Sequence, residues 1–163
     1  MTAQIKQSSP APARAERQAR LMKIVNVPMR LVLSLPFPTP LSRNLMLLTY
    51  TGRKSGKVYH QPVSYVPDGD TLLTPGGGRW KLNLRDGQPI HIRLRGRDVT
   101  ARPEKVRDIA EIQRLIGVMK AKNPNIVRFI PFIDSNGTID RAKLDTALRY
   151  GFCIVRWHLD SAH

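Results

Sequence analysis

A basic, glycine-punctuated stretch between Leu45 and Leu84 carries the residues best suited to chemistry. In its first part an apolar run ends and is followed by Gly52-Arg53-Lys54-Ser55-Gly56-Lys57. In its second part another apolar segment is followed by Gly76-Gly77-Gly78-Arg79-Trp80. Glycines let backbone N–H groups approach a ligand, and Arg and Lys side chains supply positive charge. Both parts are therefore suited to holding an anionic ligand.

The spacing within this stretch excludes the common nucleotide-binding motifs. A P-loop has four residues between its first glycine and the Gly-Lys pair, and Ser or Thr comes next. Here three residues, Arg53 to Ser55, separate Gly52 from Gly56, and Val58 follows the lysine. The glycine run at 76–78 lacks the spacing of the Rossmann G-x-G-x-x-G motif. Nucleotide hydrolysis and Rossmann-type nicotinamide binding are therefore not expected.

The other reactive side chains form no recognisable catalytic or metal-binding set. The four histidines, at positions 60, 91, 158 and 163, are not grouped with cysteines or carboxylates. The lone Cys153 lies in an apolar segment with nothing nearby to activate its thiol. The segment 134–145 begins and ends with Asp like a calcium loop, but it has Ile139 where that loop requires glycine. If the protein is an enzyme, we expect a bound cofactor to carry the chemistry.

The net charge is the most unusual bulk property of the chain. Its 163 residues include 27 Lys and Arg against 12 Asp and Glu, which gives a net charge of +15. A field of this size attracts nucleic acid, anionic lipid or a polyanionic small molecule without selecting among them. The basic strand face of His91, Arg93 and Arg95 has no interleaved aromatic residues for base stacking. Nucleic acid is therefore not expected as a partner.

The N-terminal sequence predicts neither a signal peptide nor a membrane span. Residues 1–20 lack an apolar central run, and the longest apolar run, 24–35, is interrupted by Asn26, Pro28 and Arg30. A single cysteine suits a reducing compartment, so we expect a cytoplasmic protein. Residues 1–13 are expected to be disordered, and 14–40 to form a basic helical segment that rests on a membrane surface or packs on the core. The folded domain is expected to span 41–163.

Alternating apolar residues and turn signals predict short antiparallel strands with few helices. Strands are expected over residues 45–50, 57–66, 71–74, 89–94, 98–102 and 152–159. Pro62 places its strand at a sheet edge or a bulge, and Asp68-Gly69 predicts a hairpin. Helical segments are expected over residues 79–84, 103–122 (opened by Pro103-Glu104) and 140–150. The pattern predicts an antiparallel barrel or sheet of mainly β or α+β class.

In combination these features resemble the deazaflavin (F420)-dependent nitroreductase and quinone reductase family. The resemblance is carried by the Thr51-to-Gly56 loop, the strand containing Pro62, the Asp-Gly hairpin and the sequence from Trp80 to Arg85. It is best over residues 44–102. It implies an FMN-binding-protein-like split β-barrel of about six antiparallel strands with about two or three helices. One position departs from the family pattern, because Tyr59 stands where a cation is common.

The resemblance also implies a cofactor and the residues that hold it. The cofactor would be coenzyme F420, a deazaflavin with a phosphate and a polyglutamate tail, and FMN is the alternative. The residues assigned to its binding are Arg53, Lys54, Ser55, Gly56, Lys57, Pro62, Val63, Gly77, Gly78, Arg79, Trp80 and Asn83. Residues 53–57 would hold the anionic tail, and residues 76–83 the ring. Core packing for Trp80 and helix capping for Asn83 are equally open interpretations.

The activity that the resemblance implies is hydride transfer from the reduced deazaflavin to a quinone, a nitroaromatic compound or another conjugated acceptor. The sequence does not single out a catalytic residue, and the candidate proton donors or substrate contacts are Tyr50, Tyr59, Tyr65 and Tyr150. The alternative is a non-catalytic basic module that binds a flavin-type cofactor or nucleic acid. The expected partners are a small-molecule electron acceptor and, because split barrels usually pair, a second copy of the chain.

Overall fold

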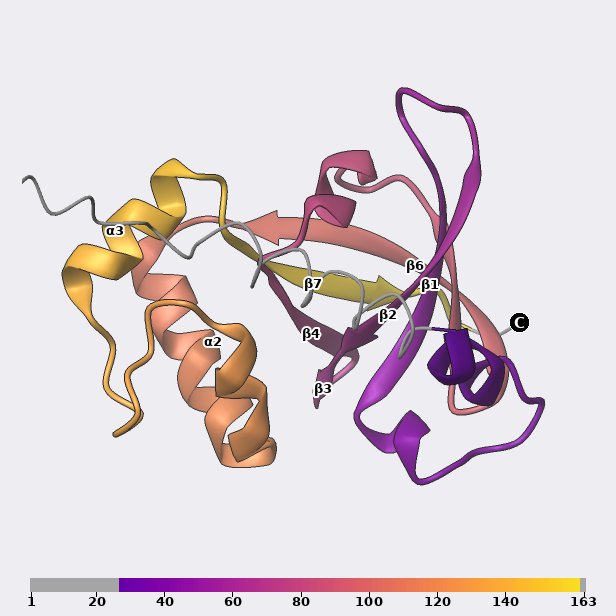
Figure 1. The fold of residues 1–163 in the computed structure, drawn as a ribbon, viewed down its shortest axis with the longest axis horizontal. Coiled ribbons are helices and arrows are strands. Elements are labelled where there is room, and N and C mark those ends of the chain that lie inside the picture. The colour runs from indigo at the N-terminus through magenta and orange to yellow at the C-terminus, as the bar shows by residue number, and fades with distance from the viewer. Residues whose placement is uncertain (1–26, 162–163) are drawn as a thin grey trace, which may run out of the picture.

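The structure is a computed structural model that describes residues 27–161, and its centre is one antiparallel sheet (Figure 1). The sheet has seven strands in the order β2-β1-β5-β6-β7-β4-β3. The strands are β1 (Leu45–Thr51), β2 (Val58–Ser64), β3 (Val66–Asp68), β4 (Thr71–Gly76), β5 (Ile90–Leu94), β6 (Arg97–Val106) and β7 (Cys153–Leu159). The structure also contains the α-helices α2 (Ile109–Lys122) and α3 (Arg141–Arg149). Its 3₁₀ turns are η1 (Leu41–Arg43), which precedes β1, and η2 (Arg79–Asn83) and η3 (Pro124–Phe129).

The sheet curls around a buried apolar interior, as expected of a split β-barrel. Residues of β2 and β4 come close to each other although the two strands are not hydrogen-bonded neighbours. The enclosed side chains include Met46, Leu48, Ile92, Val155 and Trp157, all of them at most 1% exposed. The predicted fold class is therefore confirmed.

The sheet has one strand more than predicted because the segment expected as one strand over residues 57–66 breaks at Tyr65. The Tyr65 backbone N–H donates to the carbonyl oxygen of Asn44 at 3.0 Å, outside the strand ladders. The chain on either side of Tyr65 then pairs with different strands, β2 with β1 and β3 with β4. The expected edge position of Pro62 is confirmed, because β2 ends the sheet and pairs only with β1.

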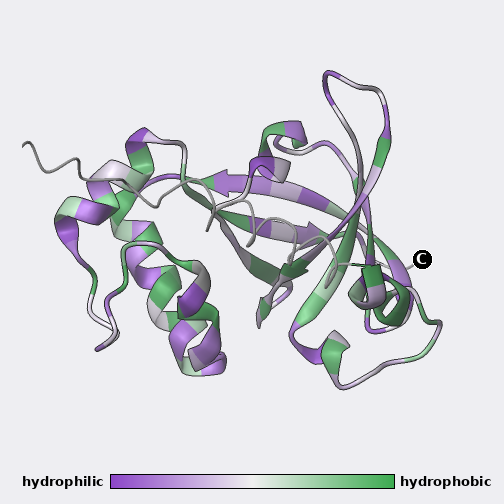
Figure 2. Cartoon of the chain, viewed as in Figure 1, coloured by the Kyte–Doolittle hydropathy of each residue, from purple (hydrophilic) through white to green (hydrophobic). Residues whose placement is uncertain are grey.

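A second apolar core lies where α2, η3 and α3 cover part of the sheet. The buried stripe of α2 consists of Ile112, Leu115, Ile116 and Met119. It packs with residues of β3, β4 and β7, among them Val66, Leu73 and Ile154. Figure 2 shows the hydrophobic residues of β4 and the stripe along α2. The Asp108 side chain caps α2 by accepting a hydrogen bond from the Glu111 backbone N–H at 2.9 Å.

The expected start of this helix at Pro103 is wrong, because residues 103–106 continue β6. Pro103 pairs with Trp157 of β7. On the other side of β6 the pairing with β5 ends at Ala101, so the N–H that proline lacks is not needed there. Glu104 accepts hydrogen bonds from Arg156 of β7, with oxygen–nitrogen distances of 3.1 and 3.2 Å. Pairing with a strand distant in sequence outweighs the local helix-start signal.

The helical predictions for residues 79–84 and 140–150 agree with the structure. The turn η2 matches the predicted segment 79–84, and α3 follows its cap Asp140 and ends before Gly151, whose φ is +87°. Residues 27–33 are helical and lead through a proline-rich loop to η1. The predicted tail 1–13 and the basic helix up to residue 26 lie outside the described residues. Within residues 27–161, no helix is both long and apolar enough to cross a membrane.

Candidate functional site

The loop between β1 and β2 folds back on itself and forms one wall of the candidate site. The Gly52 N–H donates to the Lys57 carbonyl at 2.7 Å, and the Gly56 N–H donates to the Gly52 carbonyl at 2.9 Å. Gly56 has a φ of +66°, a conformation that favours glycine. A Cβ at Gly52 would lie 2.5 Å from Ser55 Oγ and 2.7 Å from Tyr59 Cε2. The conformation of the loop therefore depends on glycine at both ends.

The turn η2 forms the opposite wall. The Trp80 and Trp157 rings stack with their centroids 6.3 Å apart and an interplanar angle of 17°. Trp157 is fully buried, and its Nε1–H donates to Thr74 Oγ1 at 3.0 Å. Gly78 precedes the turn, and a Cβ there would lie 2.5 Å from Trp80 Cδ1. The Trp80 ring is thus held against the barrel interior.

Asn83 joins the two walls. Its Oδ1 accepts a hydrogen bond from the Arg53 backbone N–H at 2.8 Å. Its Nδ2 donates to the Trp80 carbonyl oxygen at 3.3 Å. The Asn83 side chain thus braces the cationic loop against the turn η2.

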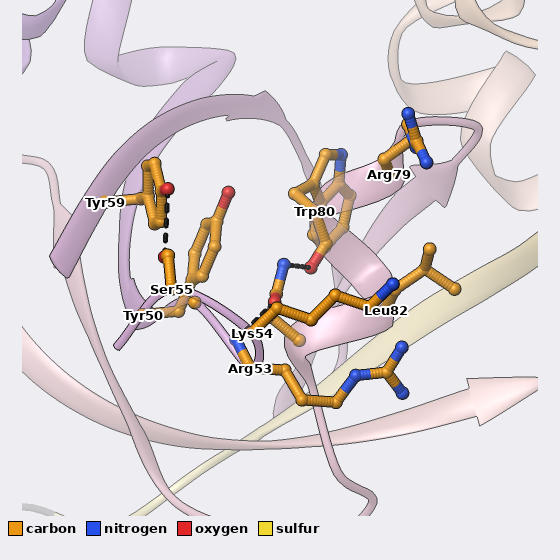
Figure 3. A pocket seen from close by; sticks show the side chains of 10 residues that line it. Tyr50, Arg53, Lys54, Ser55, Tyr59, Arg79, Trp80 and Leu82 are labelled. Atoms are coloured by element: carbon orange, nitrogen blue, oxygen red, sulfur yellow. Dashed lines mark hydrogen bonds between the residues drawn. The ribbon is translucent and has the colours of Figure 1, made fainter. Parts of the chain in front are cut away.

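A cavity of about 310 Å³ lies between these walls (Figure 3). It is lined by Tyr50, Gly52, Arg53, Lys54, Ser55, Tyr59, Arg79, Trp80, Leu82 and Asn83. The lining includes the cations Arg53, Lys54 and Arg79 and no carboxylate from the described residues. None of the ion pairs found within residues 27–161 involves these cations. The cavity therefore combines aromatic surface with uncompensated positive charge.

Two tyrosines stand at one side of this cavity and have different surroundings. The Tyr50 and Tyr59 rings stack at a centroid distance of 5.6 Å, and Tyr50 lies between Tyr59 and Trp80 (Figure 3). The Tyr59 hydroxyl forms a hydrogen bond with Ser55 Oγ at 3.1 Å. Burial raises the pKa of Tyr50, the neighbouring Tyr59 raises it further, and Arg30 opposes both. The Tyr50 hydroxyl therefore keeps its proton at neutral pH.

The structure brings half of the predicted cofactor residues into this cavity. Those that line it are Arg53, Lys54, Ser55, Arg79, Trp80 and Asn83. Gly56, Lys57, Gly77 and Gly78 belong to the same two loops but do not line it. Pro62 and Val63 lie further along β2, and Val63 is buried in the barrel interior.

The remaining tyrosine candidates lie elsewhere. Tyr65 is 2% exposed, and its hydroxyl donates to the Ser42 carbonyl oxygen at 2.8 Å. Tyr150 follows α3 and is 87% exposed. The sequence prediction missed Gly52 and Leu82, which also line the cavity. The only sequence signal for Gly52 and Leu82 is that each lies next to, or close to, residues predicted to bind the coenzyme.

Lys81 lies in η2 between two residues that line the cavity but does not line it itself. It is only 8% exposed, and its Nζ donates to the Gly76 carbonyl oxygen. Burial lowers the pKa of Lys81 and raises the pKa of the neighbouring Cys153 thiol. A Cβ at Gly76 would lie 2.6 Å from the Cys153 carbonyl oxygen. These contacts tie η2 to the end of β4.

The fold and the cavity together define a split-barrel protein with a cationic, aromatic-walled site. Residues 34–130, more than half of the chain, match the model of the F420H(2)-dependent quinone reductase family, so the chain belongs to that family. The family consists of oxidoreductases, and its name specifies coenzyme F420 as the cofactor. No curated protein matches the chain.

Two solved structures are similar to the chain, and the first of them supports the fold. One described as a domain-swapped dimer is 14% identical, covers 83% of this chain and 98% of its own, and has a TM-score of 0.51. Another, described as an F420-H2 dependent reductase (FDR-A), is 15% identical and covers 71% of this chain and 94% of its own, with a TM-score of 0.46.

The donor set of the cavity fits a coenzyme of this kind. Phosphate and carboxylate groups are bound most strongly by charged donors, and the guanidinium groups of Arg53 and Arg79 can each donate two parallel hydrogen bonds. The aromatic wall of Trp80 offers a surface for a planar ring system. The cavity therefore provides both kinds of contact that a deazaflavin with an anionic tail requires.

Proposed function

We propose that the chain binds coenzyme F420 in the cavity between the 52–57 loop and η2 and transfers hydride to a quinone, a nitroaromatic compound or another conjugated acceptor. The observation that carries the proposal is the cavity itself, in which Arg53 and Lys54 lie opposite the aromatic wall of η2 and Arg79 adds a third uncompensated cation. Membership of the F420H(2)-dependent quinone reductase family supports it.

The anionic part of the coenzyme is assigned to the loop side of the cavity. Arg53 and Lys54 extend from the loop, and Arg79 stands at the start of η2. The Asn83 hydrogen bond fixes the backbone of Arg53, so less conformational freedom is lost when the side chain binds an anion. Lys57 lies next to this cluster in sequence and would add to its field.

The ring of the coenzyme is assigned to the Trp80 side. When bound, the reduced deazaflavin supplies a hydride. The chain's own contribution is to orient the reactants. Trp80 suits this role because Trp157 prevents its ring from tilting back into the barrel. Leu82, which is 49% exposed, adds apolar surface at the same wall.

The proton that accompanies hydride in quinone reduction is assigned to the Tyr50 hydroxyl. Tyr50 lines the cavity, and its raised pKa keeps the hydroxyl protonated at neutral pH. Tyr59 is assigned a positioning role because its hydroxyl is hydrogen-bonded to Ser55 in the cationic loop. Solvent would restore the proton through the open side of the cavity.

Two finer parts of the proposal concern partners. The solved structure described as a domain-swapped dimer has the same fold and supports a homodimer for this chain, which light scattering would test.

Peripheral contact with lipid is supported by the exposed side chains of Val27, Leu31 and Phe37, at 57%, 67% and 56%. Co-sedimentation with anionic vesicles would test this lipid contact, and Leu31→Asp should lower the fraction of protein that sediments with the vesicles.

The experiment mixes the purified full chain with reduced coenzyme F420 and a soluble quinone and follows the oxidation of the coenzyme. We expect quinone-dependent oxidation and a lower kcat/KM for Arg53→Ala and Lys54→Ala. Arg97→Ala is the matched control, because Arg97 is exposed at the far end of the sheet. Tight coenzyme binding without oxidation of any acceptor would instead indicate a non-catalytic binding module.

A further inference from the structure

A second cavity, of about 530 Å³, lies at the opposite end of β1 from the candidate coenzyme site. It is lined by Pro38, Thr39, Pro40, Ser42, Arg43 and Arg95. The strand register fixes this placement. Leu47 of β1 pairs with Arg93 and Thr49 with His91, so the end of β5 lies beside the start of β1, away from the 52–57 loop. The two cavities share no residue.

The Arg95 side chain is held in place by a chain of hydrogen bonds. Its Nε donates to the Tyr65 hydroxyl at 3.0 Å, and that hydroxyl donates to the Ser42 carbonyl oxygen at 2.8 Å. Tyr65 is 2% exposed, so the anchor is rigid. With Nε engaged, the two Nη groups remain as donors on the free end of the guanidinium.

The backbone that carries Arg95 is also constrained. Arg95 has a φ of +49° and Gly96 a φ of +82°, and together they make the tight turn between β5 and β6. Asn, Asp or Gly usually occupies the first of these positions. A Cβ at Gly96 would lie 2.6 Å from the carbonyl carbon of Phe37, so the turn is pressed against the loop that leads to η1.

The facing loop is also constrained, by hydrogen bonds of its own. The Thr39 backbone N–H donates to Ser42 Oγ at 2.9 Å, and Ser42 Oγ donates to the Thr39 carbonyl oxygen at 2.8 Å. Ser42 is 4% exposed. These bonds constrain the loop just before Arg43, which lines the cavity, and Pro38 and Pro40 supply rigid apolar walls.

The charges around this cavity are unbalanced. The nearby Asp98 pairs with Arg93 at 2.7 Å. Neither Arg43 nor Arg95 takes part in an ion pair within the part of the chain that the structure describes. The cavity thus holds two guanidinium groups, one of them oriented, with no carboxylate in its lining.

From this geometry we infer a second ligand site, which binds the oxyanion group of a small molecule on Arg95 and Arg43. Phosphate and carboxylate groups both accept two parallel N–H donors from a guanidinium, which a lysine cannot reproduce. The prolines contact the carbon part of the same ligand. The site is separate from the coenzyme cavity and does not depend on its assignment.

The test is an NMR titration of the full chain with pyrophosphate and, separately, with citrate, at constant ionic strength. The amide signals of Ser42 and Gly96 report on the site. We expect a saturable shift with one or both probes, and the preferred probe tells a phosphate site from a carboxylate site. Absence of a saturable shift with either probe would overturn the inference.

Matched variants separate geometry from charge. Arg95→Lys keeps the charge but loses the guanidinium fork, and we expect it to weaken binding at least about tenfold. Tyr65→Phe removes the anchor of Arg95 and should weaken binding by about threefold or more. Arg97→Gln, on the same hairpin but outside the lining, should leave affinity unchanged. If Arg95→Lys and Arg97→Gln lowered the affinity for the probe equally, binding would depend only on the overall positive charge of the protein. That result would overturn the proposed site.

Discussion

The Asn83 side chain lies 2.8 Å from the backbone nitrogen of Arg53, a residue 30 positions earlier in the chain, and accepts its hydrogen bond. This contact joins the cationic loop after β1 to the aromatic turn η2. Because Asn83 also donates to the Trp80 carbonyl, one side chain sets the distance between the two halves of the cavity.

Replacing Asn83 should therefore impair coenzyme binding more than folding. For Asn83→Ala we expect coenzyme affinity to fall by about five- to tenfold, the equivalent of about one lost hydrogen bond, because the loop is no longer held against η2. Titration of the coenzyme, followed by its fluorescence, measures the change. Asn125→Ala, an exposed asparagine at η3, is the control. Equal affinity in both variants would show that Asn83 does not set the geometry of the cavity.

The loop should be sensitive to the smallest addition at Gly52. A methyl group there would lie 2.5 Å from Ser55 Oγ and 2.7 Å from Tyr59 Cε2, so Gly52→Ala must displace the loop or the Tyr59 ring. We expect weaker coenzyme binding and a lower melting temperature.

Gly117→Ala is the matched control for that substitution. Gly117 lies in α2, and nothing lies within 4 Å of a Cβ built there. This change should stabilise the protein by about 0.5–1 kcal/mol, since alanine favours a helix. If Gly52→Ala left coenzyme binding unchanged and did not lower the melting temperature, as expected for Gly117→Ala, the close packing of the loop would be refuted.

Removing the Tyr50 hydroxyl should affect turnover rather than binding. For Tyr50→Phe we expect kcat for quinone reduction to fall by about 100-fold, as for the loss of a general acid, with little change in coenzyme affinity. Tyr59→Phe breaks the bond to Ser55 and should instead weaken coenzyme binding. Steady-state kinetics and coenzyme titrations on both variants distinguish these roles. An unchanged kcat in Tyr50→Phe would exclude the hydroxyl as the proton source.

Acid should destabilise the fold through the carboxylates between α2 and the sheet. Hydrogen bonds from Arg114 and then Arg156 lower the pKa of Glu111 from 4.5 to about 2. His158 and Arg156 lower the pKa of Glu104 as well. A carboxylate with a lowered folded-state pKa stabilises the protein above its unfolded pKa, and this contribution is lost as the pH falls through the folded value.

The melting temperature of Glu111→Gln should accordingly lie below that of the unaltered chain at neutral pH. The difference should shrink as the pH falls from 4.5 to about 2. Asp70→Asn, an exposed residue of the β3–β4 hairpin, provides the control. A difference that did not vary with pH would contradict an electrostatic origin.

Much of the fold follows from local sequence signals. Alternation and the Asp-Gly turn located most strands, and Gly151 located the end of α3. The wrong predictions lie where contacts between residues distant in sequence determine the secondary structure. Residues 103–106 carry a helix-start signal but pair with β7, and Tyr65 breaks its strand because its backbone and side chain bind the segment at 42–44.

The site could be predicted only in part for the same reason. The cationic loop and the Trp80 turn were identified from residue types, and they line one cavity. Their connection through Asn83 depends on how β1 and η2 meet in space. The buried Lys81 could not be foreseen either, because a lysine in a basic chain normally predicts an exposed side chain.

The most direct test of the proposed coenzyme site is the dissociation constant of coenzyme F420 for the unaltered chain and for the double variant Arg53→Ala/Lys54→Ala at fixed ionic strength. The proposal predicts a loss of affinity of about 100-fold, from two charge-assisted contacts, with an unchanged melting temperature. Equal dissociation constants in the two proteins would contradict the placement of the coenzyme in this cavity.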